Sequence, residues 1–392
     1  MMRQRGRSMT KLLLLAAVLS APPAAAAELS LSESLPQLQL HGFISQGALL
    51  TTANDYLAHS SRGSFEFSEA GLNFTMPVSD RLTLGLQLFA RKLGPIGDYK
   101  ATFDWYYLDY HFRDWLGVRA GRVKLPFGLY NDVSDIDSAR TAVLLPQSIY
   151  PAQNRDFLLA QTGVEVYGYQ RLGSVGALDY RLYAGTIFID LKPQPGNPIV
   201  VRDLDVPFVV GGRVLWEPPI DGLRLGGSLQ MLRLDTNLLA PPVAGPIQYR
   251  IPATLLVASA EYVVRELLFA VEYSRWLVKA ESSRPDVVPN NPTTTSERAY
   301  ALATYRVYSW LQTGAYYSLF FPNVDRRTGR ENMQHDVALT FRFDVNPFWL
   351  VKIEGHYLHG TAALDPTLND NQPLSALRPD WALFTVKTTA FF

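Results

Sequence analysis

The last ten residues, LFTVKTTAFF (383–392), alternate in character along an extended chain. One face would carry a mainly apolar row, made of Phe384, Val386, Thr388, Ala390 and Phe392. The other face would carry a partly polar row, made of Leu383, Thr385, Lys387, Thr389 and Phe391. An apolar row toward lipid and a polar row toward water are typical of a strand in a membrane barrel. The alternation alone also fits a soluble sheet, so other features of the chain must decide between the two.

The N-terminal segment has the three parts of a secretory signal peptide. Four basic residues lie within the first eleven positions, an apolar run covers 12–19, and four alanines end the segment at residue 27. The run is far shorter than the ~20 residues of a transmembrane helix, so an uncleaved anchor is the weaker alternative. We expect a cleaved signal peptide over residues 1–27 and one exported domain over residues 28–392.

Composition narrows the classes of partner and cofactor. The sequence has 36 Lys and Arg, 36 Asp and Glu, and no cysteine. The leader holds four basic residues and no acidic one, so its removal leaves a net charge of −4. That balance argues against nucleic acid as a partner. Without cysteine, disulfides and thiolate metal sites are excluded, and we expect no cofactor and no metal.

Alternating segments rich in Tyr, Phe, Val and Leu recur along the exported domain. No apolar stretch after residue 27 is long enough for a membrane helix. We count sixteen segments, with eighteen as the alternative count. They centre on 38–50, 65–76, 82–91, 103–112, 116–124, 162–170, 178–188, 208–216, 223–234, 253–263, 267–278, 298–306, 310–320, 334–343, 349–358 and 383–392.

The connections between these segments alternate between short and long. The long ones include 51–64, 125–161, 189–207, 235–252, 279–297, 321–333 and 359–382. Short periplasmic turns, longer outer loops and an even strand count are typical of bacterial outer-membrane barrels. We therefore predict an all-β fold, a transmembrane antiparallel β-barrel whose first and last strands pair.

Charged residues share one face of several segments. In 335–343, Val337, Leu339 and Phe341 oppose the face that carries Asp336 and Arg342. A charge that faces lipid costs ~2–4 kcal/mol at mid-bilayer, so the charged faces should line a wet interior.

Large aromatic residues lie near the ends of the segments, where Tyr and Trp prefer the headgroup layer. Trp115, Trp216, Trp310 and Trp349 lie at short turns, which predicts a periplasmic girdle. Trp276, Phe320, Phe321 and Trp381 lie at the opposite ends, where a second girdle is expected.

The longest connection, 125–161, is too long for a simple hairpin and rich in Leu, Val and Ile. Connections of this length are usually functional or disordered, and the apolar content argues against disorder. We expect this third loop to fold into the lumen, where Asp132, Asp135, Asp137, Arg140 and Arg155 would line a constriction. Opposed acids and bases across a narrow pore would set its size limit and its field. Solvated loop charges or internal salt bridges are the alternative.

The run GRVKLPFG (121–128), followed by Asp137, Ala139, Arg140 and LLPQSIYP (144–151), resembles the phosphate-selective porin O and P family of outer-membrane porins. This resemblance implies a sixteen-stranded trimeric barrel with a folded third loop and passive uptake of small solutes. The terminal Phe392 resembles the C-terminal signature of outer-membrane barrels that the barrel-assembly machinery reads.

In the phosphate-specific members of this family, arginines and lysines line the channel. The matching cations near the expected constriction are Arg119, Arg122, Lys124, Arg140 and Arg155, and those on inward wall positions are Arg181, Arg213, Arg342 and Lys352. The chain departs from that pattern because acids share the same wall, namely Glu165, Asp179, Asp336 and Glu354. Selectivity for anions or for cations therefore stays open.

The facing of Arg122 and Lys124 also stays open. Strict alternation from Leu116 and Val118 would direct both outward. A bulge at Gly121 would shift the phase and turn them inward. A place at the rim above the bilayer is the third alternative.

The competing classes are an outer-membrane enzyme and a structural or adhesive barrel without an open channel. The sequence contains no G-x-S-x-G and no H-E-x-x-H motif, and alternation sends His356 and His359 to opposite faces. We therefore expect a non-enzymatic porin in the outer membrane of a Gram-negative bacterium, for small hydrophilic solutes or ions, with phosphate among the candidate anions. Its expected partners are outer-membrane lipid, lipopolysaccharide, the barrel-assembly machinery and two further copies of the chain.

Overall fold

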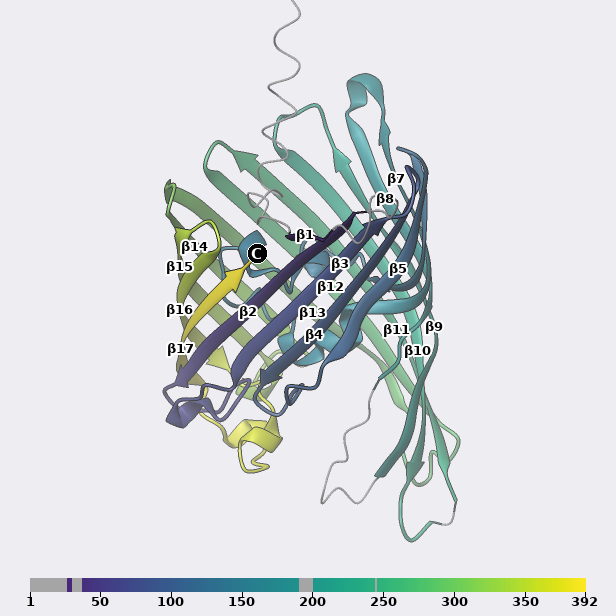
Figure 1. Cartoon of the computed structure of the whole chain (residues 1–392). Coiled ribbons are helices and arrows are strands. Elements are labelled where there is room, and N and C mark those ends of the chain that lie inside the picture. Colours follow the sequence, from purple (N-terminus) through teal and green to yellow (C-terminus); the bar gives the residue numbers. More distant parts are fainter. Residues whose placement is uncertain (1–26, 30–36, 190–199, 244) are drawn as a thin grey trace, which may run out of the picture.

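The computed structural model describes residues 27–29, 37–189, 200–243 and 245–392. It shows a closed barrel of sixteen antiparallel strands, β2 to β17, each paired with its neighbours in sequence (Figure 1). A ladder from Leu383↔Thr51 to Phe391↔Phe43 joins β17 to β2 and closes the ring. Closure leaves no free edge, so the backbone of the wall is hydrogen-bonded within the wall. The predicted fold, and the predicted pairing of the terminal strand with the first wall strand, are confirmed.

The strands of the wall differ in length, from 9 to 18 residues. Its strands are β2 (Leu38–Thr51), β3 (Phe67–Pro77), β4 (Leu82–Leu93), β5 (Thr102–Arg113), β6 (Leu116–Lys124), β7 (Ala160–Arg171), β8 (Ala177–Thr186), β9 (Val200–Glu217), β10 (Leu223–Leu239), β11 (Ile247–Val264), β12 (Leu267–Ser282), β13 (Asn291–Tyr308), β14 (Leu311–Phe321), β15 (Gln334–Asn346), β16 (Trp349–Gly360) and β17 (Asp380–Phe391). A three-residue strand, β1 (Ala27–Leu29), pairs with the start of β2.

Helical elements are short and lie in the connections. They are α2 (Arg155–Leu158) and the 3-10 turns η1 (Ser60–Arg62), η2 (Asn131–Val133), η3 (Asp137–Ala139), η4 (Ala152–Asn154), η5 (Gly173–Val175), η6 (Arg330–Asn332), η7 (Pro366–Leu368) and η8 (Leu374–Ala376). No helix among the described residues is long and apolar enough to cross a membrane.

All sixteen predicted segments correspond to strands, but β9 to β13 are longer than predicted. β13 begins at Asn291 rather than near 298, and the connection before it shortens to 283–290. The added residues read NPTTTSE, which is polar on both faces. The lipid-facing apolar signal ends there, although the backbone pairing with β12 continues. The predicted signal peptide lies outside the described residues, apart from Ala27.

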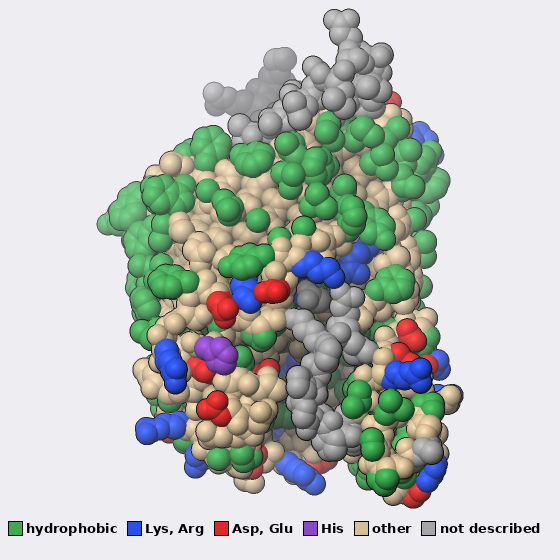
Figure 2. Space-filling view, turned by 60° about the horizontal axis from the view of Figure 1, so that its bottom comes forward, with side chains coloured by type: hydrophobic (Ala, Val, Ile, Leu, Met, Phe, Trp, Pro, Cys, Tyr) green, Lys and Arg blue, Asp and Glu red, His purple; other side chains and the backbone are tan. Residues whose placement is uncertain are grey.

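The two faces of the wall differ as predicted. Side chains on the outer face of β15 and β17 are exposed, with Val337 52%, Leu339 51% and Phe384 48% accessible. Lys352 and Glu354 on the inner face of β16 are fully buried. Figure 2 shows apolar side chains over the outer wall and charged side chains gathered around the long-loop end. The barrel is therefore apolar outside and polar inside, as a lipid-embedded wall requires.

The aromatic prediction is confirmed at the short-turn end and wrong in part at the other. Trp115 and Trp310 are about half exposed, as a girdle requires. Trp276 and Trp381 are buried inside the barrel instead, with 8% and 2% of their surface accessible. Each shares the strand parity of inward polar residues, which outweighs the preference of Trp for the interface.

Candidate functional site

The third loop (residues 125–159, between β6 and β7) lies inside the barrel and reaches its wall on several sides (Figure 1). Apolar residues on one side pack against β11 to β13 in a buried cluster that includes Phe127, Leu145, Ile149, Leu255 and Trp276. Other apolar residues of the loop, Val143 and Leu144, join a second cluster with Leu358 and Leu383. Burial of these side chains explains why so apolar a segment is not solvated.

Two buried carboxylates of the wall hold the backbone of the third loop. Glu272 on β12 accepts a hydrogen bond from Leu129 N at 2.9 Å and one from Tyr300 Oη at 2.7 Å. Glu354 on β16 accepts from Val143 N and Leu144 N at 2.8 and 2.9 Å. Each contact satisfies loop amides that would otherwise be buried without a partner. The sequence indicates these roles only through the inward parity of both acids.

Asp132 is the first of three acids of the third loop that form ion pairs with basic side chains. Its carboxylate pairs with Arg181 of β8 and lies 3.1 Å from Arg213 of β9. Arg181 also pairs with Glu165 of β7 at 2.7 Å. Burial alone would raise the pKa of Asp132, but Arg181 and Arg213 outweigh it and hold the pKa below its usual value. Asp132 is therefore ionised at neutral pH.

Asp135 lies at the centre of the loop's second anchor. Its carboxylate is 2.6 Å from Lys124 Nζ and 3.6 Å from Arg155. Arg155 makes a bidentate contact with Asp104 of β5, at 2.9 and 2.7 Å. Arg122 joins the same group through Nε, which donates to the carbonyl of Asp104 at 2.8 Å. These contacts fasten both ends of the third loop to β5 and β6.

Asp137 carries the densest set of contacts. One oxygen lies 2.7 Å from Lys387 Nζ and accepts from Thr389 Oγ1 at 2.8 Å. The other lies 3.0 Å from Arg140 and 3.6 Å from Lys352. Burial alone would raise the pKa of Asp137. The cations, Lys387 foremost, have the larger effect and hold the pKa well below its usual value. The inner row of the closing strand therefore binds the third loop directly.

The structure places the predicted cations in ion pairs or on carbonyl groups. Lys352 Nζ donates to the carbonyls of Asp137 and Ala142 at 2.8 and 3.1 Å. Arg342 binds Asp344 at 2.8 Å and the carbonyl of Ser138 at 2.6 Å. The predicted residues therefore gather around the third loop, largely as internal salt bridges, which was the alternative left open above.

The structure excludes one of the alternatives given above for Arg122 and Lys124. Both ladders of β6 run through Gly121 without a register shift, so the bulge considered there is absent. Gly121 instead has a φ of +133°, and its missing side chain lets the backbone of Tyr106 approach. Lys124, at the end of its strand, reaches the third loop and binds Asp135 there.

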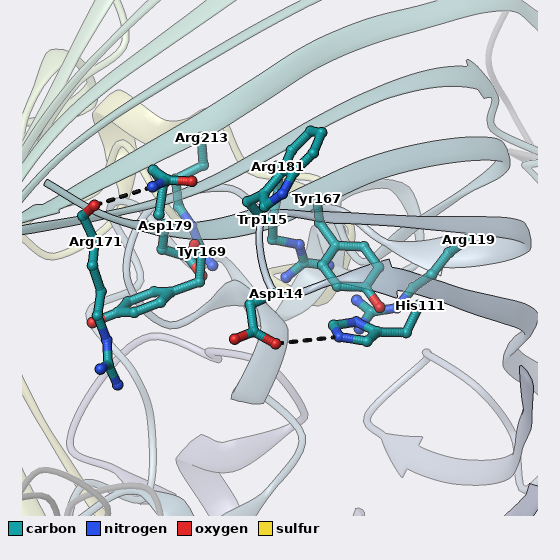
Figure 3. A pocket seen from close by; sticks show the side chains of 12 residues that line it. His111, Asp114, Trp115, Arg119, Tyr167, Tyr169, Arg171, Asp179, Arg181 and Arg213 are labelled. Carbon is teal, nitrogen blue, oxygen red and sulfur yellow. Dashed lines mark hydrogen bonds and ion pairs between the residues drawn. The ribbon is translucent and has the colours of Figure 1, made fainter. Parts of the chain in front are cut away.

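A cavity of about 760 Å³ lies on the short-turn side of the third loop, against β5 to β9 (Figure 3). Its lining comes from Arg119, Arg181, Arg213, Arg171, Asp114, Asp179, His111, Trp115, Tyr167, Gly168, Tyr169 and Gln170. Arg119 lies 4.2 Å from the ring centre of Tyr167 and pairs with Asp109 and Glu165 at 2.9 and 3.0 Å. Two of the lining arginines, Arg181 and Arg213, also bind Asp132 and so connect the wall of the cavity to the third loop.

Histidines and acids form no candidate metal centre within the described part of the chain. His356 faces the interior, where its ring nitrogens contact Asp336 at 2.9 Å and Glu354 at 3.0 Å. His359 lies on the outer face beside Asp380 at 2.7 Å. The two therefore point to opposite faces, as predicted.

Comparison with known proteins supports the fold. The chain matches no known family profile and no curated protein. It is similar to the outer-membrane protein OmpT of Vibrio cholerae, with a TM-score of 0.59 and 12% identity over 92% of this chain and 99% of that one. It is also similar to OmpF of Salmonella typhi in complex with daunomycin (TM-score 0.58, 12% identity, 93% of this chain, 100% of that one).

A third similar structure is the anion-selective porin of Comamonas acidovorans (TM-score 0.55, 12% identity). That match covers 91% of this chain and 99% of the porin. At these identities the likeness concerns the fold alone. The fold of this chain is a porin-like outer-membrane β-barrel.

Proposed function

We propose that the protein is an outer-membrane porin through which small hydrophilic solutes or ions diffuse, without catalysis. The observation that carries this proposal is the cavity lined by wall arginines, two of which, Arg181 and Arg213, also bind Asp132 of the third loop. Fixed opposite charges at a narrow point favour solutes by size and charge. The apolar outer wall and the polar interior are also what a water-filled barrel in lipid needs.

Anions, with phosphate as one example, are the finer part of the proposal. Four arginines line the cavity against two aspartates, Asp114 and Asp179. The carboxylate partners of Arg119, namely Asp109 and Glu165, are not among the lining residues. The four guanidinium groups would offer hydrogen-bond donors to anions, while acids outside the lining offset the charge of Arg119, Arg181 and Arg213.

We further propose a homotrimer in the outer membrane, in contact with lipid and lipopolysaccharide. Trimeric forms occur among the structural neighbours, which include an OmpT trimer. The exposed C-terminal Phe392 would be read by the barrel-assembly machinery.

A barrel without an open channel is the second candidate function. It is favoured by the number of wall strands that the third loop touches, from Asp104 on β5 through Glu272 on β12 to Lys387 on β17. A loop attached to the wall at many points would leave less room for solute than a loop attached on one side only.

Swelling of proteoliposomes separates these two candidates. Liposomes that contain the purified protein are placed in isosmotic solutions of a pentose and of a trisaccharide. A diffusion channel predicts fast swelling in the pentose and little in the trisaccharide. No swelling above protein-free liposomes in either sugar would contradict the proposed function.

A further inference from the structure

Arg298 on β13 is held between two aromatic rings inside the barrel. Its ladder neighbours are Ser274 on β12 and Phe320 on β14, and its side chain is half-buried. The guanidinium carbon lies 3.4 Å from the ring centre of Trp276 and 4.8 Å from that of Phe320. Contacts this short fix the guanidinium, and they explain the inward position of Trp276.

Arg298 differs from the arginines around the third loop because none of the described side chains gives it an acidic partner. Nη1 donates to the carbonyl of Ser148 at 3.2 Å, and Nε donates to Ser296 Oγ at 3.3 Å. No carboxylate of the described residues lies within ion-pair distance of it. By contrast, Arg181, Arg213 and Arg140 each contact an acid.

Arg298 keeps part of its surface accessible, and a guanidinium without a counter-ion has hydrogen-bond donors and a charge to offer. An arginine has five N–H donors, and the two contacts above use only part of this set. Its planar edge matches a carboxylate, which can accept two parallel hydrogen bonds. The rings of Trp276 and Phe320 offer apolar surface beside that edge, which suits an anion with an apolar body.

We propose that Arg298, Trp276 and Phe320 form a binding site for small organic carboxylates, where the third loop meets the wall at Ser148. The carboxylate binds the guanidinium edge, and its apolar part lies against the rings. The inference rests on the proposed function, because a solute must enter the interior to reach the site. It assigns a solute class that neither the cavity nor the family resemblance supplies.

Benzoate titration by isothermal calorimetry tests the site on the purified full-length barrel in detergent. Three variants accompany the wild type: Arg298→Gln, Arg298→Lys and the matched control Arg306→Gln. Arg306 lies on the same strand with the same parity but pairs with Asp344 at 3.4 Å. Heat-modifiable electrophoretic mobility verifies that each variant is folded.

We expect Arg298→Gln to weaken benzoate binding at least tenfold and Arg306→Gln to leave it unchanged. Arg298→Lys, which keeps the charge but loses the planar edge, should weaken binding at least threefold. Undetectable binding to the wild type, or equal affinity in the wild type and Arg298→Gln, would overturn the site. Ion conductance is recorded on the same preparations, so a conducting channel that does not bind benzoate refutes the site and leaves the proposed function standing.

Discussion

Replacement of Asp137 by Asn should loosen the third loop without changing the barrel. The carboxylate is buried and lies 2.7 Å from Lys387 and 3.0 Å from Arg140. Its loss leaves Lys352, which is fully buried, with carbonyl partners only. Asn keeps the size of the side chain, so the change isolates the charge.

The magnitude follows from the burial of these groups. Removing one partner of a buried ion pair costs about 3–5 kcal/mol, because the remaining charge stays buried and uncompensated. Lys387 keeps a second partner in Glu69, so we take the lower end, about 3 kcal/mol. Since 1.4 kcal/mol is a factor of ten, opening of the loop should become about 100-fold more frequent.

Hydrogen exchange measured by mass spectrometry on residues 137–144 reports that opening directly. A matched control is Asp286→Asn, because Asp286 pairs with Arg284 at 2.8 Å on an exposed outer connection. The control should leave exchange in residues 137–144 unchanged. Exchange at the wild-type rate in Asp137→Asn would show that the ion pairs do not hold the loop.

Three further predictions concern pH, selectivity and backbone strain. The folded pKa of Asp137 lies below its ordinary 3.8, so its contribution to the stability of the loop is fully present above pH 3.8 and is lost as the pH falls through the lower folded value. Protection factors of the loop, corrected for intrinsic exchange, should therefore stay constant from pH 7 to about 4.5. A loss of protection near pH 6 would contradict this prediction. Arg181→Gln should shift the reversal potential in a KCl gradient toward cation selectivity, whereas Arg284→Gln should not. Equal reversal potentials in Arg181→Gln and the wild type would show that Arg181 does not line the solute path. Gly128→Ala should lower the temperature at which electrophoretic mobility changes, because the residue has a φ of +60° and a Cβ there would lie 2.4 Å from Tyr150 Oη. The expected loss of stability is about 1–3 kcal/mol. An unchanged temperature would show that the loop accommodates the added methyl group.

The strands could be predicted from the sequence because their signal is local. Alternation within about ten residues follows from one apolar and one aqueous surface, and it marked every strand of the wall. The signal fails where both surfaces are wet. Residues 291–297 pair with β12 above the apolar band, and nothing in their composition distinguishes them from a loop.

The contacts of the candidate site could be predicted only in part. Strand parity directs Arg181, Lys352 and Glu354 inward, and the structure agrees. The partners of these residues depend on how the third loop crosses the barrel, which no local pattern encodes. The sequence already shows that Trp276 shares the strand parity of Glu272. That parity indicates an inward position, whereas the general preference of Trp for the membrane interface suggested an outward one.

The proposed function requires a water-filled path through the barrel interior past the third loop. Single-channel recording of the wild-type protein in planar bilayers tests it most directly. An open path predicts discrete, stable conductance steps in KCl that persist over long recordings. Insertion of folded protein, verified by its mobility, without any conductance step would contradict an open path and would favour a barrel closed by its third loop.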